Sequence, residues 1–252
     1  MVDTRTQAYI NLFAVLGTLE NLCELVPEAA ELAQTPKPIA IGFDVKDGPA
    51  ATLTFKDGKC RMEPGIGKVS VHMSFSSPAQ FNAMIDGANP PISLGVILNM
   101  NFLLKQFTPL SKLLESYMRP TPEQLEDEKF FEVSTTLMFC TISVALSQIA
   151  NNDEIGKFSA AHTPDGDIAF NIADGPGATL RVKDGRFLTL KKKGDNPRAI
   201  MEFESIKLAR QLFDNEVNAL GCIGTGRISM RGMINMLDNL NRLLDRVALY
   251  LA

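Results

Sequence analysis

A twelve-residue segment that occurs twice constrains the fold of this chain more than any other feature. The residues Asp47-Gly-Pro-Ala-Ala-Thr-Leu-Thr-Phe-Lys-Asp-Gly58 return 127 residues later as Asp174-Gly-Pro-Gly-Ala-Thr-Leu-Arg-Val-Lys-Asp-Gly185, and nine of the twelve positions are identical. The period is close to half of the 252-residue chain. A repeat of that length indicates two copies of one domain, because solenoid repeats are far shorter.

The charge balance argues against nucleic acid as the main partner. The chain has a formal net charge of −4. Residues 1–126 contribute −3, from 10 basic and 13 acidic residues, and residues 127–252 contribute −1, from 15 basic and 16 acidic residues. Neither half carries the basic excess that nucleic-acid-binding domains show. The hydrophobic content of 45% is ordinary for a folded globular chain.

Cysteine spacing and the chain ends favour a cytoplasmic location. Cys23, Cys60, Cys140 and Cys222 lie far apart, in no metal-ligand spacing, so we expect reduced structural thiols and no metal or cofactor. The N-terminal residues lack the layout of a signal peptide. The stretch 130–150 approaches the length of a membrane span, but it contains Glu132, Gln148 and several Ser and Thr residues. We therefore predict a buried helix, and at most peripheral contact with a membrane.

Each half of the chain predicts the same order of elements. A long apolar helix comes first, at Tyr9–Val26 and at about Lys129–Ala150. A β meander follows, with turns at four Asp-Gly pairs, and the short spacing of its strands predicts antiparallel hairpins. A helix comes next, then a short apolar strand, which we place at 226–232 in the second copy and around 94–100 in the first.

The predicted strands and the middle helices complete this pattern. The strands are Ile39–Val45, Ala51–Phe55, Lys59–Glu63 and Lys68–Phe75, then Asp167–Ala173, Ala178–Val182, Arg186–Lys191 and Arg198–Phe203. The middle helices are Pro78–Ile85 and Ser205–Phe213. Both halves end in a helix with an apolar seam. The linker 119–128 contains two prolines and four acidic residues, so we predict domains of residues 1–120 and 121–252.

The second copy is similar to a known family. A strand, an Asp-Gly turn, a strand that ends in Val-Lys-Asp-Gly185, a later strand and helix, and Gly226-Arg-Ile-Ser-Met-Arg-Gly232 together resemble the sterol carrier protein two domain, also called the nonspecific lipid-transfer protein family. The resemblance covers about 157–236, and through the repeat about 39–107. The first copy departs from it, because Gly95-Val-Ile-Leu-Asn-Met-Asn101 lacks the basic residue and the closing glycine.

The resemblance implies an α+β fold of two tandem sterol-carrier-like domains, the first divergent, each with an antiparallel sheet covered by helices. It also implies an apolar tunnel between sheet and helices that accepts lipids or fatty-acyl chains. In the second copy Phe187, Ile228 and Met230 occupy positions in the tunnel wall by this resemblance. On the helical side we assign further wall residues from the apolar faces of the helices: Leu212, Phe213, Met233, Met236 and Leu237.

No catalytic arrangement stands out in the sequence. His72 and His162 have no cysteine, serine or carboxylate nearby at the spacing of a triad or a metal site. The segment Gly221-Cys-Ile-Gly-Thr-Gly226 imitates a phosphate-binding loop, but it follows a predicted helix and enters a strand, which is the reverse of the required order. Lys191, Lys192 and Lys193 form either a solvated hairpin or a weak docking site for anionic membranes.

Three classes of function remain open. The first is non-catalytic binding or transfer of a lipid or another apolar small molecule. The second is a structural or protein-interaction module whose tunnels are filled by residues such as Phe102, Phe107, Phe187 and Phe213, and which dimerises through its terminal helices. The third is an enzyme, which the lack of a catalytic arrangement disfavours. We predict the first.

Overall fold

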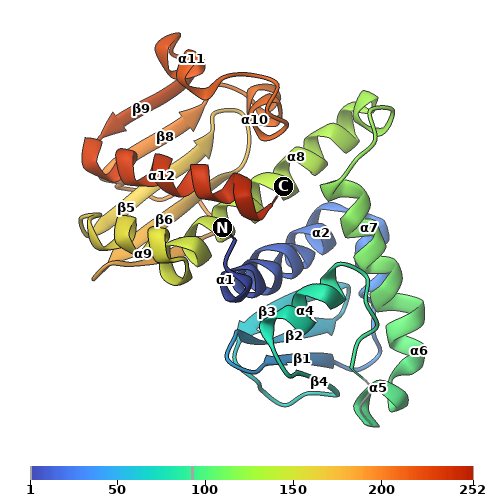
Figure 1. Ribbon diagram of the computed structural model, residues 1–252. Helices are drawn as coiled ribbons and strands as arrows, with labels where there is room; N and C mark the ends of the chain where they lie inside the picture. The colour runs from blue at the N-terminus through green and yellow to red at the C-terminus, as the bar shows by residue number, and fades with distance from the viewer. Residues whose placement is uncertain (1, 92–93, 252) are drawn as a thin grey trace. The chain divides into compact units, whose positions relative to one another are not determined.

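The computed structural model describes residues 2–91 and 94–251, and the chain divides into two compact units, residues 1–133 and 134–252. Each unit combines a β-sheet with helices that cover it, which confirms the predicted α+β class (Figure 1). The division falls inside the helix α8 (Glu128–Asn152), later in the chain than the predicted boundary after residue 120.

The first unit begins with a helical stretch that covers its sheet. The helices of this unit are α1 (Thr4–Tyr9), the π-helical η1 (Ile10–Val15), the 3-10 turn η2 (Leu16–Thr18), α2 (Leu19–Leu25), α3 (Pro27–Leu32), α4 (Pro78–Ile85), α5 (Leu94–Leu98), α6 (Met100–Phe102), the π-helical η3 (Leu103–Phe107), α7 (Thr108–Met118) and η4 (Gln124–Glu126). Its strands are β1 (Ile39–Val45), β2 (Ala50–Lys56), β3 (Lys59–Pro64) and β4 (Val71–Phe75), in the order β3-β2-β1-β4.

The second unit contains most of α8 and the elements that follow it. Its further helices are α9 (Glu154–Ala161), α10 (Ile206–Phe213), α11 (Ala219–Gly224) and α12 (Ile234–Tyr250). Its strands are β5 (Gly166–Ile172), β6 (Gly177–Lys183), β7 (Arg186–Leu190), β8 (Ala199–Phe203) and β9 (Ile228–Gly232), in the order β7-β6-β5-β8-β9. Figure 1 shows α12 lying across this sheet.

The strand register of the two sheets is the same at the offset of the sequence repeat. Ile41 pairs with Leu53 in the first sheet, and Ile168 pairs with Leu180 in the second. The turns also agree, because Asp57 and Asp184 both adopt a φ of 50°. A duplicated unit predicts this agreement, although the duplication itself stays a prediction.

The prediction of fully antiparallel sheets is wrong at one pairing in each unit. β4 runs parallel to β1, and β8 runs parallel to β5. The short interval before β4 suggested a hairpin, but residues 65–70 instead cross back over the outer face of the sheet. The Thr52 hydroxyl fixes this crossing, since it donates to the Gly65 carbonyl (2.9 Å) and accepts from the Gly67 amide (2.9 Å). Thr179 donates to the Lys192 carbonyl (2.8 Å) in the second unit.

The predicted strand around 94–100 is also wrong, because α5 is a helix. Its continuous apolar run without alternation does not distinguish a helix from a strand. A Cβ atom on Gly95 would lie 2.9 Å from the Ser70 carbonyl oxygen and 3.2 Å from the Val71 Cα. The helix therefore packs directly on the backbone of β4. It covers the strand edge that β9 covers by pairing with β8 in the second unit.

α8 is the central helix of the second unit. It is long and apolar enough to cross a membrane, but 67% of its most apolar window is buried inside the protein. Phe139 stacks on Phe170 of β5 with ring centroids 5.0 Å apart. Two of its polar side chains bond the edge strand β7: the Ser147 hydroxyl lies 2.5 Å from the Thr189 hydroxyl, and Asn151 donates to the Phe187 carbonyl (2.8 Å). The Thr141 and Ser143 hydroxyls instead donate to carbonyls within α8.

Candidate ligand-binding site

One face of the second sheet is apolar where β8 and β9 pair. Met201 lies opposite Met230, and Phe203 lies opposite Ile228. The alternate residues point to the other face of the sheet, where Arg231 forms an ion pair with Glu202 (3.3 Å). The period of two along a strand therefore separates a charged outer face from an apolar inner face.

Two helices cover this inner face. Phe213 of α10 meets Phe203 edge-on, with ring centroids 6.3 Å apart. The helix α12 contacts the strand β9, because the side-chain amide of Asn241 donates a hydrogen bond to the Met230 sulfur (3.8 Å). Ser205 caps α10 by accepting a hydrogen bond from the Leu208 amide (3.2 Å). The apolar face of the β8–β9 pair thus contacts Phe213 of α10 on one side and Asn241 of α12 on the other.

The predicted site residues fall into two groups by exposure. Four are buried: Phe187, Ile228, Met236 and Leu237. The other four are half-buried: Leu212, Phe213, Met230 and Met233. All but Phe187 lie on β9, α10 or the start of α12, and we call these seven residues the apolar corner. It contains a buried floor and a partly accessible apolar rim.

Phe187 is not part of the apolar corner. It lies on β7, at the opposite edge of the sheet from β9. Four strand spacings separate the two edges, which amounts to about 19 Å. The backbone of Phe187 exchanges two hydrogen bonds with the Asn151 side chain (2.8 and 2.9 Å), so this residue belongs to the contact between β7 and α8. Sequence position alone could not place it relative to the other seven.

Met201 and Phe203 complete the floor of the apolar corner, although the sequence-based assignment did not include them. Both are buried, with exposed fractions of 2% and 4%. The signal was present in the sequence, because Ala199, Met201 and Phe203 alternate with Ile200 and Glu202. Met201 and Phe203 could not be assigned to the site from the sequence, because their position depends on the parallel pairing of β8 with β5.

A buried ion pair fixes the far end of α12. The Asp153 carboxylate accepts hydrogen bonds from Arg246 (2.7 Å), from the Tyr250 hydroxyl (2.6 Å) and from the Gly156 amide (2.9 Å). Burial alone would raise the pKa of Asp153. The hydrogen bonds from Arg246, Tyr250 and Gly156 outweigh burial and hold the pKa below its ordinary value. Asp153 also caps α9, so one carboxylate joins both helices.

The two histidines that the sequence singled out lie on β4 and at the end of α9, where the His162 carbonyl accepts hydrogen bonds from Asn235 (3.4 Å) and Asn239 (3.2 Å) of α12. His72 faces Asp44 across β4 and β1 (3.5 Å), and the His162 ring contacts the Phe158 carbonyl (2.7 Å). Within residues 2–91 and 94–251, no three His, Cys, Asp or Glu side chains are placed to hold a metal ion. None of the four cysteines, Cys23, Cys60, Cys140 and Cys222, is part of a disulfide. The Gly221–Gly226 segment forms the end of α11 and the turn into β9, not a phosphate loop.

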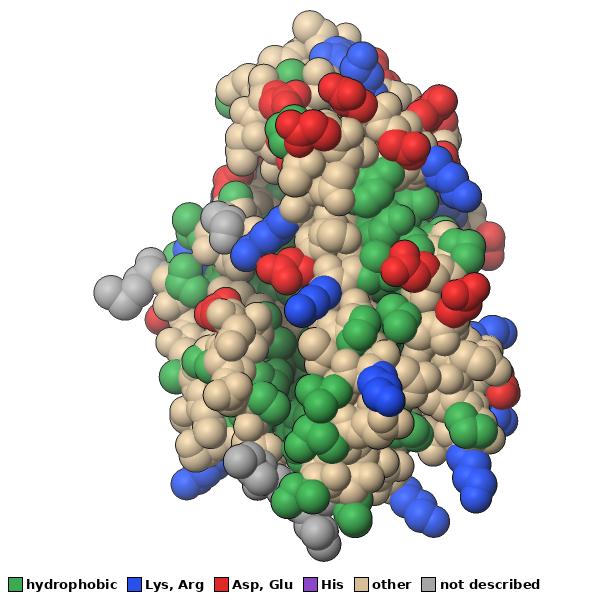
Figure 2. Space-filling view, turned by 90° about the vertical axis from the view of Figure 1, so that its right-hand side faces the viewer, with side chains coloured by type: hydrophobic (Ala, Val, Ile, Leu, Met, Phe, Trp, Pro, Cys, Tyr) green, Lys and Arg blue, Asp and Glu red, His purple; other side chains and the backbone are tan. Residues whose placement is uncertain are grey.

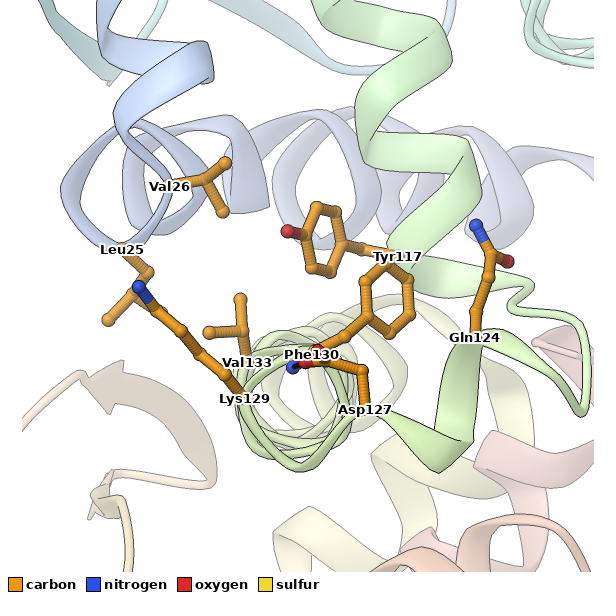
Figure 3. A pocket seen from close by; sticks show the side chains of 8 residues that line it. All are labelled: Leu25, Val26, Tyr117, Gln124, Asp127, Lys129, Phe130 and Val133. Atoms are coloured by element: carbon orange, nitrogen blue, oxygen red, sulfur yellow. Dashed lines mark hydrogen bonds between the residues drawn. The ribbon is translucent and has the colours of Figure 1, made fainter.

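The first unit contains a separate pocket of about 430 Å³ (Figure 3). Tyr117 and Phe130 stack at its centre, with ring centroids 4.3 Å apart and an interplanar angle of 13°. Burial, followed by the nearby charges of Glu28 and Asp127, raises the pKa of Tyr117. The remaining lining residues are Leu25, Val26, Gln124, Lys129 and Val133.

A second pocket of about 680 Å³ lies on the surface of the first unit, beside Cys23, Gln34 and Lys59. Neither of these two pockets lies at the apolar corner. The predicted tunnel between sheet and helices therefore stays a prediction.

Comparisons with known proteins give only coarse information. No protein-family model matches the chain, and no curated protein matches it. The solved structures that align with it include sterol carrier protein domains. The sterol carrier protein domain 2 of Helicoverpa armigera is 16% identical, covers 45% of this chain and 88% of its own, and has a TM-score of 0.36.

Two further solved structures align over a similar length. A ubiquinone synthesis protein, UbiJ-SCP2, is 14% identical over 43% of this chain and 94% of its own, with a TM-score of 0.35. Sterol carrier protein 2 from Yarrowia lipolytica, in its apo form, is 17% identical over 42% and 89%, with a TM-score of 0.31. The α+β class therefore rests on the sheets and helices described above and not on these alignments.

Proposed function

We propose that the apolar corner of the second unit binds a lipid or fatty-acyl chain without catalysis. The observation that carries this proposal is the combination of a buried apolar floor with a half-buried apolar rim. Ligand sites typically combine apolar walls with access from solvent.

The physical driving force is the removal of hydrocarbon from water. Each buried methylene contributes about 0.8 kcal/mol, so a sixteen-carbon chain can supply roughly 10 kcal/mol before the entropy losses of binding. Met230, Met233 and Met236 suit ligands of varied shape, because the thioether side chain is flexible and polarisable. Binding by desolvation needs no catalytic residue, cofactor or metal.

A structural role is the alternative that the first unit favours. Phe55 of β2 packs against Phe102 and Phe107, with ring centroids 5.4 and 6.0 Å apart. Phe81 of α4 similarly meets Phe43 and Phe75 of the sheet. These rings occupy the interface between sheet and helices, as the filled-tunnel interpretation expects. In this interpretation the protein keeps the fold without a lipid ligand and serves as a structural module that dimerises.

Matched tryptophan variants test the proposal. Leu212 in α10 and Ile85 in α4 are equivalent at the repeat offset, and both are half-buried at the end of their helices. Displacement of a fluorescent fatty acid from the full chain measures affinity. We expect Leu212→Trp to weaken binding at least about tenfold, the loss that follows from about 1.4 kcal/mol of steric conflict, and Ile85→Trp to leave it unchanged. Equal affinities in both variants, or no fatty-acid binding by the unaltered chain, would contradict the proposal.

A further inference from the structure

Four large apolar side chains lie exposed on consecutive helical turns of the first unit. Ile97, Leu98, Met100 and Leu104 have exposed fractions of 56%, 75%, 41% and 61%. We call them the α5–η3 patch. Figure 2, which looks onto α5, α6 and α7, shows hydrophobic side chains gathered in the lower part of this face. Single exposed apolar residues are normal, but a contiguous group marks an interaction site.

The side of this segment opposite the patch packs on the core of the first unit. Val96 and Phe102 are buried, with exposed fractions of 4% and 5%. The Phe102 ring packs on Phe55 of the sheet. The Asn99 side chain donates to the Ser70 carbonyl (3.1 Å), which joins the segment to the start of β4. The four patch residues therefore belong to a well-packed segment, because the opposite side of the same segment is part of the core.

The sequence interval that contains the patch differs in charge from the rest of the chain. No acidic residue occurs between Asp86 and Glu115, whereas Lys105 and Lys112 lie in this interval and are exposed. The whole chain carries a formal charge of −4. A helical segment with exposed apolar residues, lysines and no acids is typical of helices that lie in the membrane interface.

The other candidate for membrane contact is weakened by the structure. The basic residues around Lys191, Lys192 and Lys193 include Arg181 and Lys183. Arg181 pairs with Asp167 (2.9 Å), and Lys183 pairs with Asp165 (2.6 Å). Local carboxylates thus neutralise part of the charge that the sequence placed there, whereas the interval that contains the α5–η3 patch has no carboxylate.

We propose that the α5–η3 patch docks the protein on the surface of an anionic lipid bilayer. The four apolar side chains enter the interface between headgroups and acyl chains, and Lys105 and Lys112 lie among the lipid phosphates. This docking does not depend on ligand binding by the apolar corner, because it involves the first unit alone. A strand, β9, stands at the corresponding place in the second unit, which is why the patch has no counterpart there.

Two double variants with equal changes of charge and similar initial exposure test this docking. Leu98→Asp with Leu104→Asp alters the patch. Leu220→Asp with Ile234→Asp is the control, since these residues are 77% and 80% exposed in the second unit. Co-sedimentation of the full chain with vesicles of phosphatidylcholine and phosphatidylserine measures binding, and circular dichroism checks the fold. We expect at least about a tenfold loss for the patch variant, from two lost apolar insertions, and less than about a twofold change for the control.

The lysines give a second, separate measurement. Changing Lys105 or Lys112 to Ala should weaken binding to the anionic vesicles by about fivefold for each lysine, and should leave binding to pure phosphatidylcholine unchanged. Equal losses in both double variants, or loss only when Lys191, Lys192 and Lys193 are replaced, would overturn the proposal. So would a chain that ignores vesicles and self-associates through Leu98 and Leu104, which size-exclusion chromatography would detect.

Discussion

Replacement of Asp153 tests how the second unit holds α12 over its sheet. The carboxylate lies at the corner between α8 and α9, and its side chain is 3% exposed, against 13% for its partner Arg246. Besides Arg246 it accepts hydrogen bonds from Tyr250 and from the Gly156 amide. Removing it therefore breaks the contact with α12 and the N-terminal cap of α9 together.

The expected loss follows from these contacts. Removing one partner of a buried ion pair costs about 3–5 kcal/mol, because the other charge stays buried without compensation. Loss of an N-cap costs about 1 kcal/mol and overlaps with this figure. We expect Asp153→Ala to lower the free energy of unfolding by about 3–5 kcal/mol. Asp153→Asn keeps the cap and should cost about 1 kcal/mol less. Ser205→Ala removes only the cap of α10 and should cost about 1 kcal/mol.

Urea unfolding followed by circular dichroism measures these losses, with hydrogen exchange of α9 and α12 as the local readout. The local readout is needed because a chain of two units need not unfold in one step. Exchange in α12 should accelerate in Asp153→Ala and not in Ser205→Ala. If both variants lose the same stability, the buried carboxylate does not anchor α12 and the reasoning fails.

Three further outcomes follow from the same geometry. The pKa of Asp153 is lowered in the folded state. Its carboxylate therefore stabilises the fold fully above the unfolded pKa of about 3.9, and this stabilisation is lost as the pH falls through the folded pKa. The stability of Asp153→Asn should depend less on pH across this acid range than that of the unaltered chain. Burial, together with Glu24, raises the pKa of the Cys23 thiol to about 12, so at pH 8 it should react with a thiol reagent far more slowly than the half-buried Cys140. Gly95→Ala should cost about 1 kcal/mol of stability and speed hydrogen exchange in α5, because the added Cβ would meet the β4 backbone. Gly224→Ala is the control and should not destabilise the protein, because there is open space around Gly224. Equal stability of the two variants would contradict this packing.

Local chemistry explains which elements the sequence could predict. The strand Ile39–Val45 and the helix Pro78–Ile85 have the predicted bounds, because turns or caps flank them. Asp57 and Gly58 both take positive φ at the predicted turn. Alternation and turn residues act within a few positions along the chain, so a single sequence reveals them.

Features that depend on distant contacts were not predictable in this way. The parallel pairing of β4 with β1 depends on how the Thr52 hydroxyl binds the crossing loop. The helix α5 depends on the close approach of Gly95 to β4. Phe187 matched the expected apolar pattern, yet it lies across the sheet from the other candidates, because strand order and not sequence distance decides which side chains meet.

Methionine methyl resonances offer the most direct test of the apolar corner as a ligand site. Met230, Met233 and Met236 belong to the corner, whereas Met73 is buried in the first sheet and serves as an internal reference. In the full chain labelled with 13C at the methionine methyl groups, a fatty acid added in steps should shift the three corner resonances together and leave Met73 in place. Corner resonances that stay fixed while the fatty acid binds elsewhere, or does not bind at all, would contradict the account.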